Sequence, residues 1–185
     1  MRRLLTILLT FAATPIPAQT TDWPTFQLTV DATSDADFAR VNLATGKVLA
    51  SDDSTTNWDL AIKRYEFRLG AGASAALIVD NTVVAAANPY AGNATSQLPA
   101  FDAITAADIP ATKEFTTTIP NSVALEDSPP FLYGLDPASP HAVLPTFNIY
   151  LVPSGDAVHK IQMLDYYHPV TGASRYITLR AARVQ

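Results

Sequence analysis

Few side chains in this sequence can coordinate a transition metal. It has no cysteine, three histidines (His141, His159 and His168) and, apart from the initiating residue, one methionine, Met163. Imidazole and thioether groups are good donors for metal ions, and the tyrosine phenolate is a third. Several of the seven tyrosines lie near the histidines in the sequence, namely Tyr133, Tyr150, Tyr166 and Tyr167. Metal chemistry would therefore depend on isolated donors and not on a clustered ligand motif.

The sequence carries no motif for catalysis. There is no G-x-S-x-G, no H-E-x-x-H and no Gly-rich phosphate loop with a lysine. Carboxylates lie mostly in turn-like segments, where Asp commonly caps backbone groups; a pair that hydrolyses a sugar stays open as a minor alternative. The net charge of −5 without a basic run argues against nucleic acid and anionic membranes as partners. We expect a non-enzymatic protein.

The N-terminus has the features of a secretory signal peptide in the usual order. Arg2 and Arg3 precede an apolar run of roughly ten residues, 4–13, which is too short to span a bilayer. Two prolines then break the helix before Ala18. We expect residues 1–18 to be removed and residues 19–185 to form one domain; an uncleaved anchor or a buried first helix is the alternative. The missing cysteine excludes disulfides and a lipid anchor, so we expect a soluble protein of the periplasm or the cell exterior, with no membrane span.

Alternation of apolar and polar residues predicts an all-β fold. The C-terminal part is the clearest, because two turns about 17 residues apart separate three alternating segments and predict a three-stranded meander. We expect a single antiparallel β-sandwich or partly open barrel with long loops. The expected strands are 26–30, 39–43, 48–49, 58–69, 75–79, 82–86, 114–119, 131–133, 147–151, 158–167 and 175–184.

The segment Trp58–Leu69 changes its apolar parity halfway along. Trp58, Leu60 and Ile62 share one parity, while the apolar residues from position 65 onward share the other. A strand keeps both sets on one face only if a residue is inserted, so we expect a β-bulge near Lys63 and Arg64. Trp58 would then anchor the core, and Asp59 would pair with Arg64 or bind backbone.

Between these strands the sequence has less regular segments. A short apolar hairpin is expected over 75–86. Residues 88–130 are rich in Pro, Thr, Ser and Ala, with a helical turn near 103–108, and 136–145 is expected to be a Pro-rich loop. Loops of this length in a compact domain are commonly functional.

Two blocks of the sequence together resemble the HmuY family of extracytoplasmic haem-binding proteins. The first is ADFARVNLATGKVLA followed by NWDLAIKRYEFRLGAG, and the second is LYGLDPASPHAVLPTFNIYLV followed by HKIQMLDYYHPVTGASRYITLR. The resemblance implies an all-β fold whose loops clamp one haem between two axial ligands. It also implies haem capture, with transfer to an outer-membrane receptor.

Carrying the family's ligands over to this chain identifies one candidate. The best-known family members ligate haem through two His or two Met residues, one of them in a middle region that here contains neither type from Asn88 to Pro140. At the other position an ungapped alignment places Leu135, which has no donor atom, and His141 follows six residues later. His141 is therefore the candidate axial ligand, the second ligand is unknown, and no metal other than haem iron is expected.

The other donors have simpler interpretations. The alternative for His141 is a loop residue bonded to backbone. His159 and Met163 share one face of a strand and suit the core, and His168 suits a solvated turn. The charges around Lys63 could contact haem propionates or form a solvated face. The runner-up to a haem or porphyrin carrier is a module on the same fold that binds another small ligand or a protein partner without haem.

Overall fold

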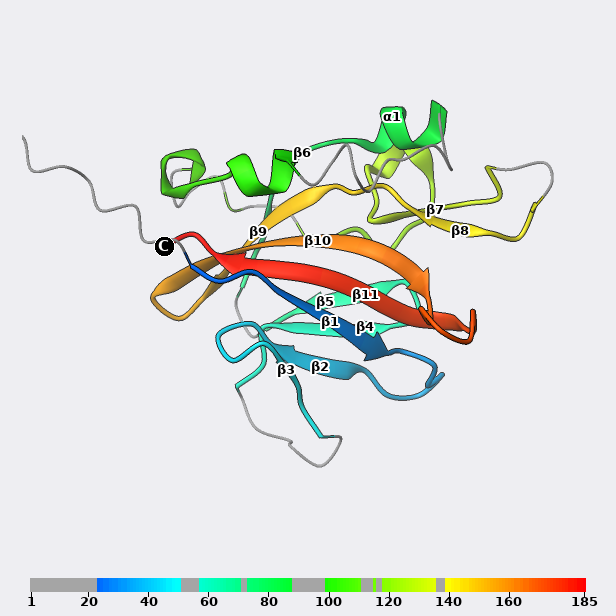
Figure 1. Cartoon of the computed structure of the whole chain (residues 1–185), viewed down its shortest axis with the longest axis horizontal. Coiled ribbons are helices and arrows are strands. Elements are labelled where there is room, and N and C mark those ends of the chain that lie inside the picture. The colour runs from blue at the N-terminus through cyan, green and yellow to red at the C-terminus, as the bar shows by residue number, and fades with distance from the viewer. Residues whose placement is uncertain are drawn as a thin grey trace, which may run out of the picture.

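The chain forms two antiparallel sheets packed face to face, as the computed structural model shows (Figure 1). It describes residues 23–50, 57–70, 73–87, 99–110, 115, 118–135 and 139–185. The predicted β-sandwich is confirmed, and the expected signal segment 1–18 lies outside these residues. No helix within the described ranges is long and apolar enough to cross a membrane.

The larger sheet contains the predicted C-terminal meander. Its strand order is β1-β11-β10-β9-β6, and every neighbouring pair is antiparallel. Alternation in the sequence places one side of each strand in the core and thereby fixes the register. The strands are β1 (Phe26–Asp31), β6 (Ala76–Val79), β9 (Ile149–Ser154), β10 (Ala157–Tyr167) and β11 (Ser174–Arg183).

The smaller sheet has the order β3-β2-β4-β5. Its strands are β2 (Ala39–Asn42), β3 (Lys47–Val48), β4 (Leu60–Lys63) and β5 (Glu66–Leu69). The expected bulge at Lys63 and Arg64 is wrong, because a two-residue turn there ends one strand and begins the next. Leu60 pairs with Leu69 and Ile62 with Phe67, so cross-strand partners of opposite parity face the same core. Arg64 has a left-handed φ of 57° at this turn.

The core lies between the two sheets. Val41, Leu60 and Ile62 from the smaller sheet pack with Ile161 and Leu179 from the larger one, all with at most 1% of their surface exposed. Burial of this apolar surface supplies the main free energy of folding for a chain without disulfides. The sandwich therefore depends on packing alone.

The outer face of the larger sheet is covered by helical turns, which give the molecule a third layer (Figure 1). The predicted strand 82–86 is wrong, since α1 (Thr82–Ala87) occupies it and Asp80 Oδ1 accepts the first helical N–H, that of Thr82, at 2.9 Å. Helical residues 99–103 and η1 (Ala106–Asp108) agree with the expected turn near 103–108. Lys160 anchors this layer by donating from Nζ to two backbone oxygens, those of Phe101 and Ile104.

A small separate hairpin completes the fold. β7 (Phe131–Tyr133) follows the short helix η3 (Leu125–Asp127) and pairs with β8 (Val143–Pro145). The expected loop 136–145 is therefore wrong at its end, where Val143 pairs with Tyr133. Of the strand expected at 114–119, residues 114, 116 and 117 lie outside the described part, and 115, 118 and 119 are not in a strand.

Trp58 and Asp59 have different roles from one another. The expectation that Trp58 anchors the core is wrong, because the residue is only half-buried just before β4. Asp59 was expected either to pair with Arg64 or to bind backbone, and it binds backbone. Its Oδ2 accepts the Leu43 N–H at 2.7 Å. This bond joins the end of β2 to the start of β4.

Candidate functional site

His141 lies beside the β7–β8 hairpin, where strand pairing brings it to Tyr133. The Gly134 N–H donates to the Ala142 carbonyl, so the chain next to β7 and the chain next to β8 run together. Nδ1 of His141 is 2.5 Å from the Tyr133 hydroxyl oxygen, and the two ring centres are 6.1 Å apart. Both side chains are exposed, so His141 is available to a ligand.

Aromatic side chains from four segments form a groove next to this pair. We call it the tyrosine groove; it has a volume of about 360 Å³, and its lining includes Arg64, Tyr65, Tyr133, His141, Tyr166, Tyr167 and Arg175. The buried Tyr166 ring packs edge-on against Phe131 with centres 5.5 Å apart and is the link from the groove to the core. Aromatic walls of this kind suit a flat apolar ligand.

A second cavity of about 570 Å³ lies beside the groove. His141 and Tyr167 line both cavities, so these two side chains stand between them. The Tyr167 hydroxyl accepts the Val143 N–H at 3.0 Å, which joins the end of β10 to β8. The imidazole of His141 therefore borders both the tyrosine groove and the second cavity.

Two arginines give the tyrosine groove positive charge. Arg64 comes from the β4–β5 turn and Arg175 from the start of β11, and both ion-pair with Asp35, at 3.4 and 3.3 Å. Ala32 holds them together through backbone, since its carbonyl accepts the Arg64 N–H and its N–H donates to the Arg175 carbonyl. Guanidinium groups bind carboxylates well, so the groove suits an apolar ligand that carries acidic groups.

Tyr166 is an unsuitable metal ligand despite its place in the groove. Burial raises the pKa of its hydroxyl, and the positive charges of Arg175 and Arg64 oppose this only in part. The residue is therefore a neutral phenol at neutral pH, whereas iron binds the phenolate. The imidazole of His141 is the better donor.

The other predicted donors lie away from the groove. Met163 is 1% exposed and belongs to the core, as expected. His159 is buried at the other end of β10. His168 is not simply solvated, since its Nδ1 accepts the N–H groups of Val170 and Thr171, each at 3.2 Å, and so stabilises the β10–β11 turn. Of the charges around Lys63, only Arg64 lines the groove.

The residues present fit a porphyrin held by one axial imidazole. His141 would supply the donor, the tyrosines would supply flat walls, and Arg64 and Arg175 would supply partners for the carboxylates. In the described part of the chain, neither cavity is lined by a second histidine or by a methionine, and no group of three metal-binding side chains occurs. The site therefore supports one axial ligand and not a matched pair.

Sequence reasoning named His141 as a candidate ligand and missed most of the residues around it. Arg175, Tyr65 and Asp35 gave no signal, because the fold brings them together from segments far apart in the chain. Tyr133 was named as one of several possible donors, but its contact with His141 follows from β8, which was not predicted.

Comparisons with known proteins agree with the fold. A family model described as HmuY protein matches residues 34–180. A crystal structure from Bacteroides vulgatus, described as an HmuY-like haem-binding protein, matches with a TM-score of 0.50 and 17% identity, over 85% of this chain and 90% of that one. A crystal structure from Bacteroides fragilis, described in its name as a lipoprotein, matches with a TM-score of 0.50 and 18% identity, over 90% and 91% of the two chains. Among curated proteins, none matches significantly.

Proposed function

Since the chain belongs to the HmuY family, we propose that it binds haem or a related porphyrin at His141 and carries it outside the cytoplasm. The tyrosine groove and its neighbouring cavity are the binding site in this proposal. The protein acts as a carrier and not as an enzyme.

One observation supports this proposal most strongly: His141 borders both cavities while Tyr133 holds its Nδ1. In the tautomer whose Nδ1–H donates to the tyrosine oxygen, Nε2 keeps its lone pair free for iron. A ligating histidine usually donates its other ring N–H to such a partner, which fixes the tautomer and orients the ring. The pair is thus suited to hold iron through Nε2 of His141.

Two arginines in the groove could bind the propionates of haem. Haem carries two propionates, and Arg64 and Arg175 are two guanidinium groups on the same groove. Both are bound to Asp35, whose side chain is 72% exposed, so the ion pairs lie in solvent where a ligand carboxylate can compete with Asp35. We therefore assign these arginines to propionate binding.

A second function is favoured by the missing second donor. A porphyrin without iron, or another flat acidic ligand, needs the aromatic walls and the arginines but no axial ligand. In this alternative His141 forms part of the wall, and the chain is a carrier on the same fold that does not use iron coordination.

A titration followed by absorbance separates the two functions. Purified protein is titrated with ferric haem and, separately, with iron-free protoporphyrin IX, and the Soret band is recorded. Saturable one-to-one binding of haem, with a Soret shift that His141→Ala removes, is the result expected for the proposal. Equal affinity for both porphyrins would favour the alternative, and no saturable change with either would overturn both.

Export and delivery belong to the same proposal. The features of residues 1–18 support secretion, and residues 19–185 would be the released carrier in the periplasm or outside the cell. An outer-membrane receptor is the expected recipient of the haem. Cell fractionation followed by N-terminal sequencing tests this, with Gln19 expected as the first residue; recovery of the intact chain from the cytoplasm would contradict it.

A further inference from the structure

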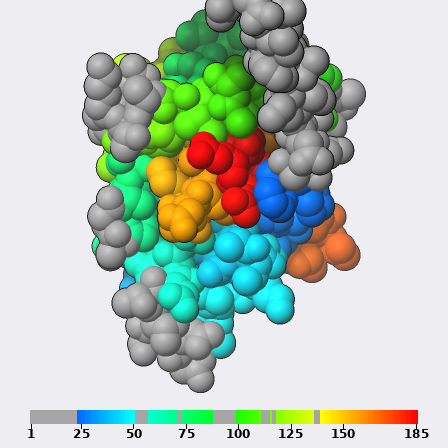
Figure 2. Space-filling view, turned by 90° about the vertical axis from the view of Figure 1, so that its left-hand side faces the viewer, coloured from blue at the N-terminus to red at the C-terminus, as the bar shows by residue number. Residues whose placement is uncertain are grey.

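A second cavity system lies at the opposite end of the sandwich from His141. There the start of β1, the β2–β3 turn, the β9–β10 turn and the end of β11 come together (Figure 2). His159 lines this end of β10 and Tyr167 the other, eight residues further along, which is roughly 25 Å of extended strand. The two sites therefore do not overlap.

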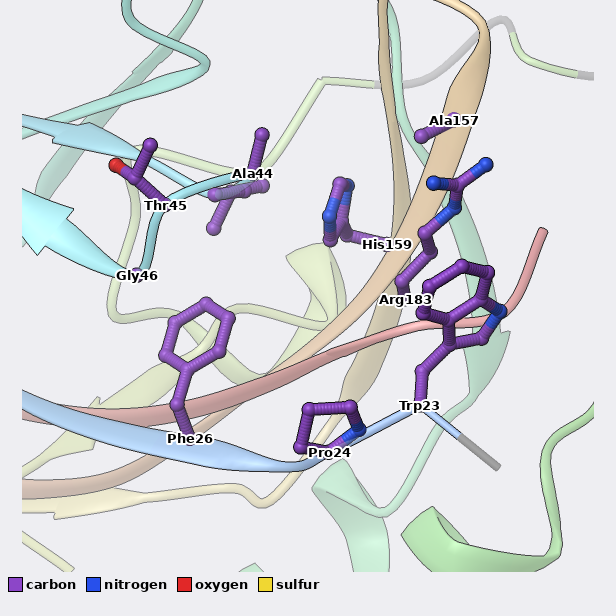
Figure 3. Close-up of a pocket in the computed structure, with 10 residues that line it drawn as sticks. Trp23, Pro24, Phe26, Ala44, Thr45, Gly46, Ala157, His159 and Arg183 are labelled. Atoms are coloured by element: carbon purple, nitrogen blue, oxygen red, sulfur yellow. The ribbon is translucent and has the colours of Figure 1, made fainter. Parts of the chain in front are cut away.

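This end cavity has a volume of about 380 Å³ and mostly apolar walls. Trp23, Phe26, Leu43 and Ala157 line it, together with the polar residues His159 and Arg183 (Figure 3). A volume near the lower limit of known ligand sites suits a small organic molecule. The walls require a ligand with an apolar body.

His159 is the buried polar group of this cavity. Only 3% of its surface is exposed, and its enclosed Nδ1 has no hydrogen-bond partner among the described residues. A protonated Nδ1 would bury an N–H without an acceptor, which costs more free energy than burying the lone pair of an unprotonated Nδ1. The tautomer with the proton on Nε2 is therefore favoured. Burial lowers the pKa of the imidazole, with Asp59 opposing and Arg183 adding to the shift, so the ring is neutral at neutral pH. The N–H of the neutral ring is then on Nε2.

Arg183 gives the same cavity a fixed positive charge. Its guanidinium lies 4.3 Å from the centre of the Trp23 ring, and its Nε donates to the Gln185 carbonyl at 2.5 Å. Figure 3 shows its side chain between Trp23 and His159. The two contacts orient a guanidinium whose remaining N–H groups suit a carboxylate.

We propose that this end cavity binds a small amphipathic carboxylate, an acid group on a compact aromatic or aliphatic body. The acid group would accept from Arg183 and from Nε2–H of His159, and the body would lie against Phe26, Leu43 and Trp23. A cation would be repelled by Arg183, and an uncharged ligand would gain no ion pair from it. This proposal is independent of haem binding.

Calorimetry with a matched pair of probes tests the proposal. The purified protein is titrated with 3-phenylpropionate and with its neutral analogue 3-phenylpropanamide. We expect the acid to bind with a Kd of about 1 mM or tighter, which is a modest efficiency for a ligand of about 11 heavy atoms. The amide should bind about tenfold more weakly, because it lacks the charge that Arg183 recognises.

Variants assign the binding to this cavity. Arg183→Gln should remove the preference for the acid, and Arg183→Lys should restore part of it; Lys47→Gln, which removes a nearby exposed charge outside the lining, should change nothing. Ala157→Phe should fill the cavity and abolish binding of both probes, with folding checked by circular dichroism. Equal affinity for acid and amide, no saturable heat with the acid at 10-fold its expected Kd, or full binding by folded Ala157→Phe would each overturn the proposal.

Discussion

The Tyr133 hydroxyl and Nδ1 of His141 are 2.5 Å apart, although the two residues are eight positions apart in the sequence. The contact exists because β7 and β8 pair next to it, with Tyr133 opposite Val143. It fixes the ring of an exposed imidazole that borders two cavities. Orientation of this kind is what distinguishes a ligand-binding histidine from one that is merely exposed.

Tyr133→Phe should therefore weaken haem binding without abolishing it. Loss of a partner that orients a metal ligand typically costs 10- to 100-fold in affinity, and we expect roughly tenfold here because the site is exposed. His141→Ala should have the larger effect and remove the Soret shift. His168→Asn is the matched control, since it removes another histidine but keeps an acceptor for the Val170 and Thr171 N–H groups. Equal affinity of Tyr133→Phe and wild type would show that the bond does not orient a ligand.

Arg64 and Arg175 adopt unfavourable backbone conformations next to the tyrosine groove. Their φ angles are 57° and 70°, in the left-handed region that costs a residue with a side chain about 1 kcal/mol or more. Replacing both with Gly should raise the free energy of unfolding by about 1 kcal/mol, since the exposed ion pairs to Asp35 that are lost contribute little. Haem affinity should fall at the same time. Urea denaturation measures the change in stability, and the haem titration measures the change in affinity. A double variant that is clearly less stable than wild type would show that the backbone at these two arginines is not strained.

Much of the fold could be predicted from the sequence because each strand buries one face. Phe26, Leu28 and Val30 alternate with exposed residues in β1 as expected. The parity change after Ile62 was also a real signal, but a bulge and a tight turn produce the same pattern along the chain, and only strand pairing distinguishes them. α1 was missed because its six residues are apolar or small throughout and show no helical periodicity.

The candidate site was less predictable than the fold because it depends on distant pairs. Asp35 meets Arg64 and Arg175 through the packing of two sheets, which leaves no pattern in the local sequence. For His159 the local sequence predicted burial but not the cavity. Its alternation with Ile161 and Met163 correctly indicated a buried position. The cavity beside it is formed by residues far apart in the sequence, which no local pattern shows.

Gly70 should be intolerant of any side chain. A Cβ at this position would lie 2.6 Å from the Trp58 carbonyl oxygen, and the Gly70 N–H already donates to the Asp59 carbonyl at 2.9 Å. The backbone must therefore move to accept a methyl group, and we expect Gly70→Ala to lower the free energy of unfolding by about 1–3 kcal/mol. Gly172→Ala is an informative control: nothing lies within 4 Å of its added Cβ, so any loss there reflects its φ of 69° alone. Urea denaturation should show that Gly70→Ala is less stable than Gly172→Ala. The reverse order would show that the contact with the Trp58 carbonyl oxygen does not limit the side chain at Gly70.

His159 should make the protein less stable in mild acid. Burial lowers the pKa of its imidazole below the ordinary value of 6.5; Asp59 opposes the shift and Arg183 adds to it. As the pH falls through 6.5, the unfolded chain takes up the proton while the folded chain does not, so the free energy of unfolding decreases until the lower folded pKa is reached. His159→Leu should reduce this decrease between pH 7.5 and pH 5. Urea denaturation at the two pH values measures the effect, and an identical acid-induced loss in wild type and His159→Leu would exclude His159 as its source.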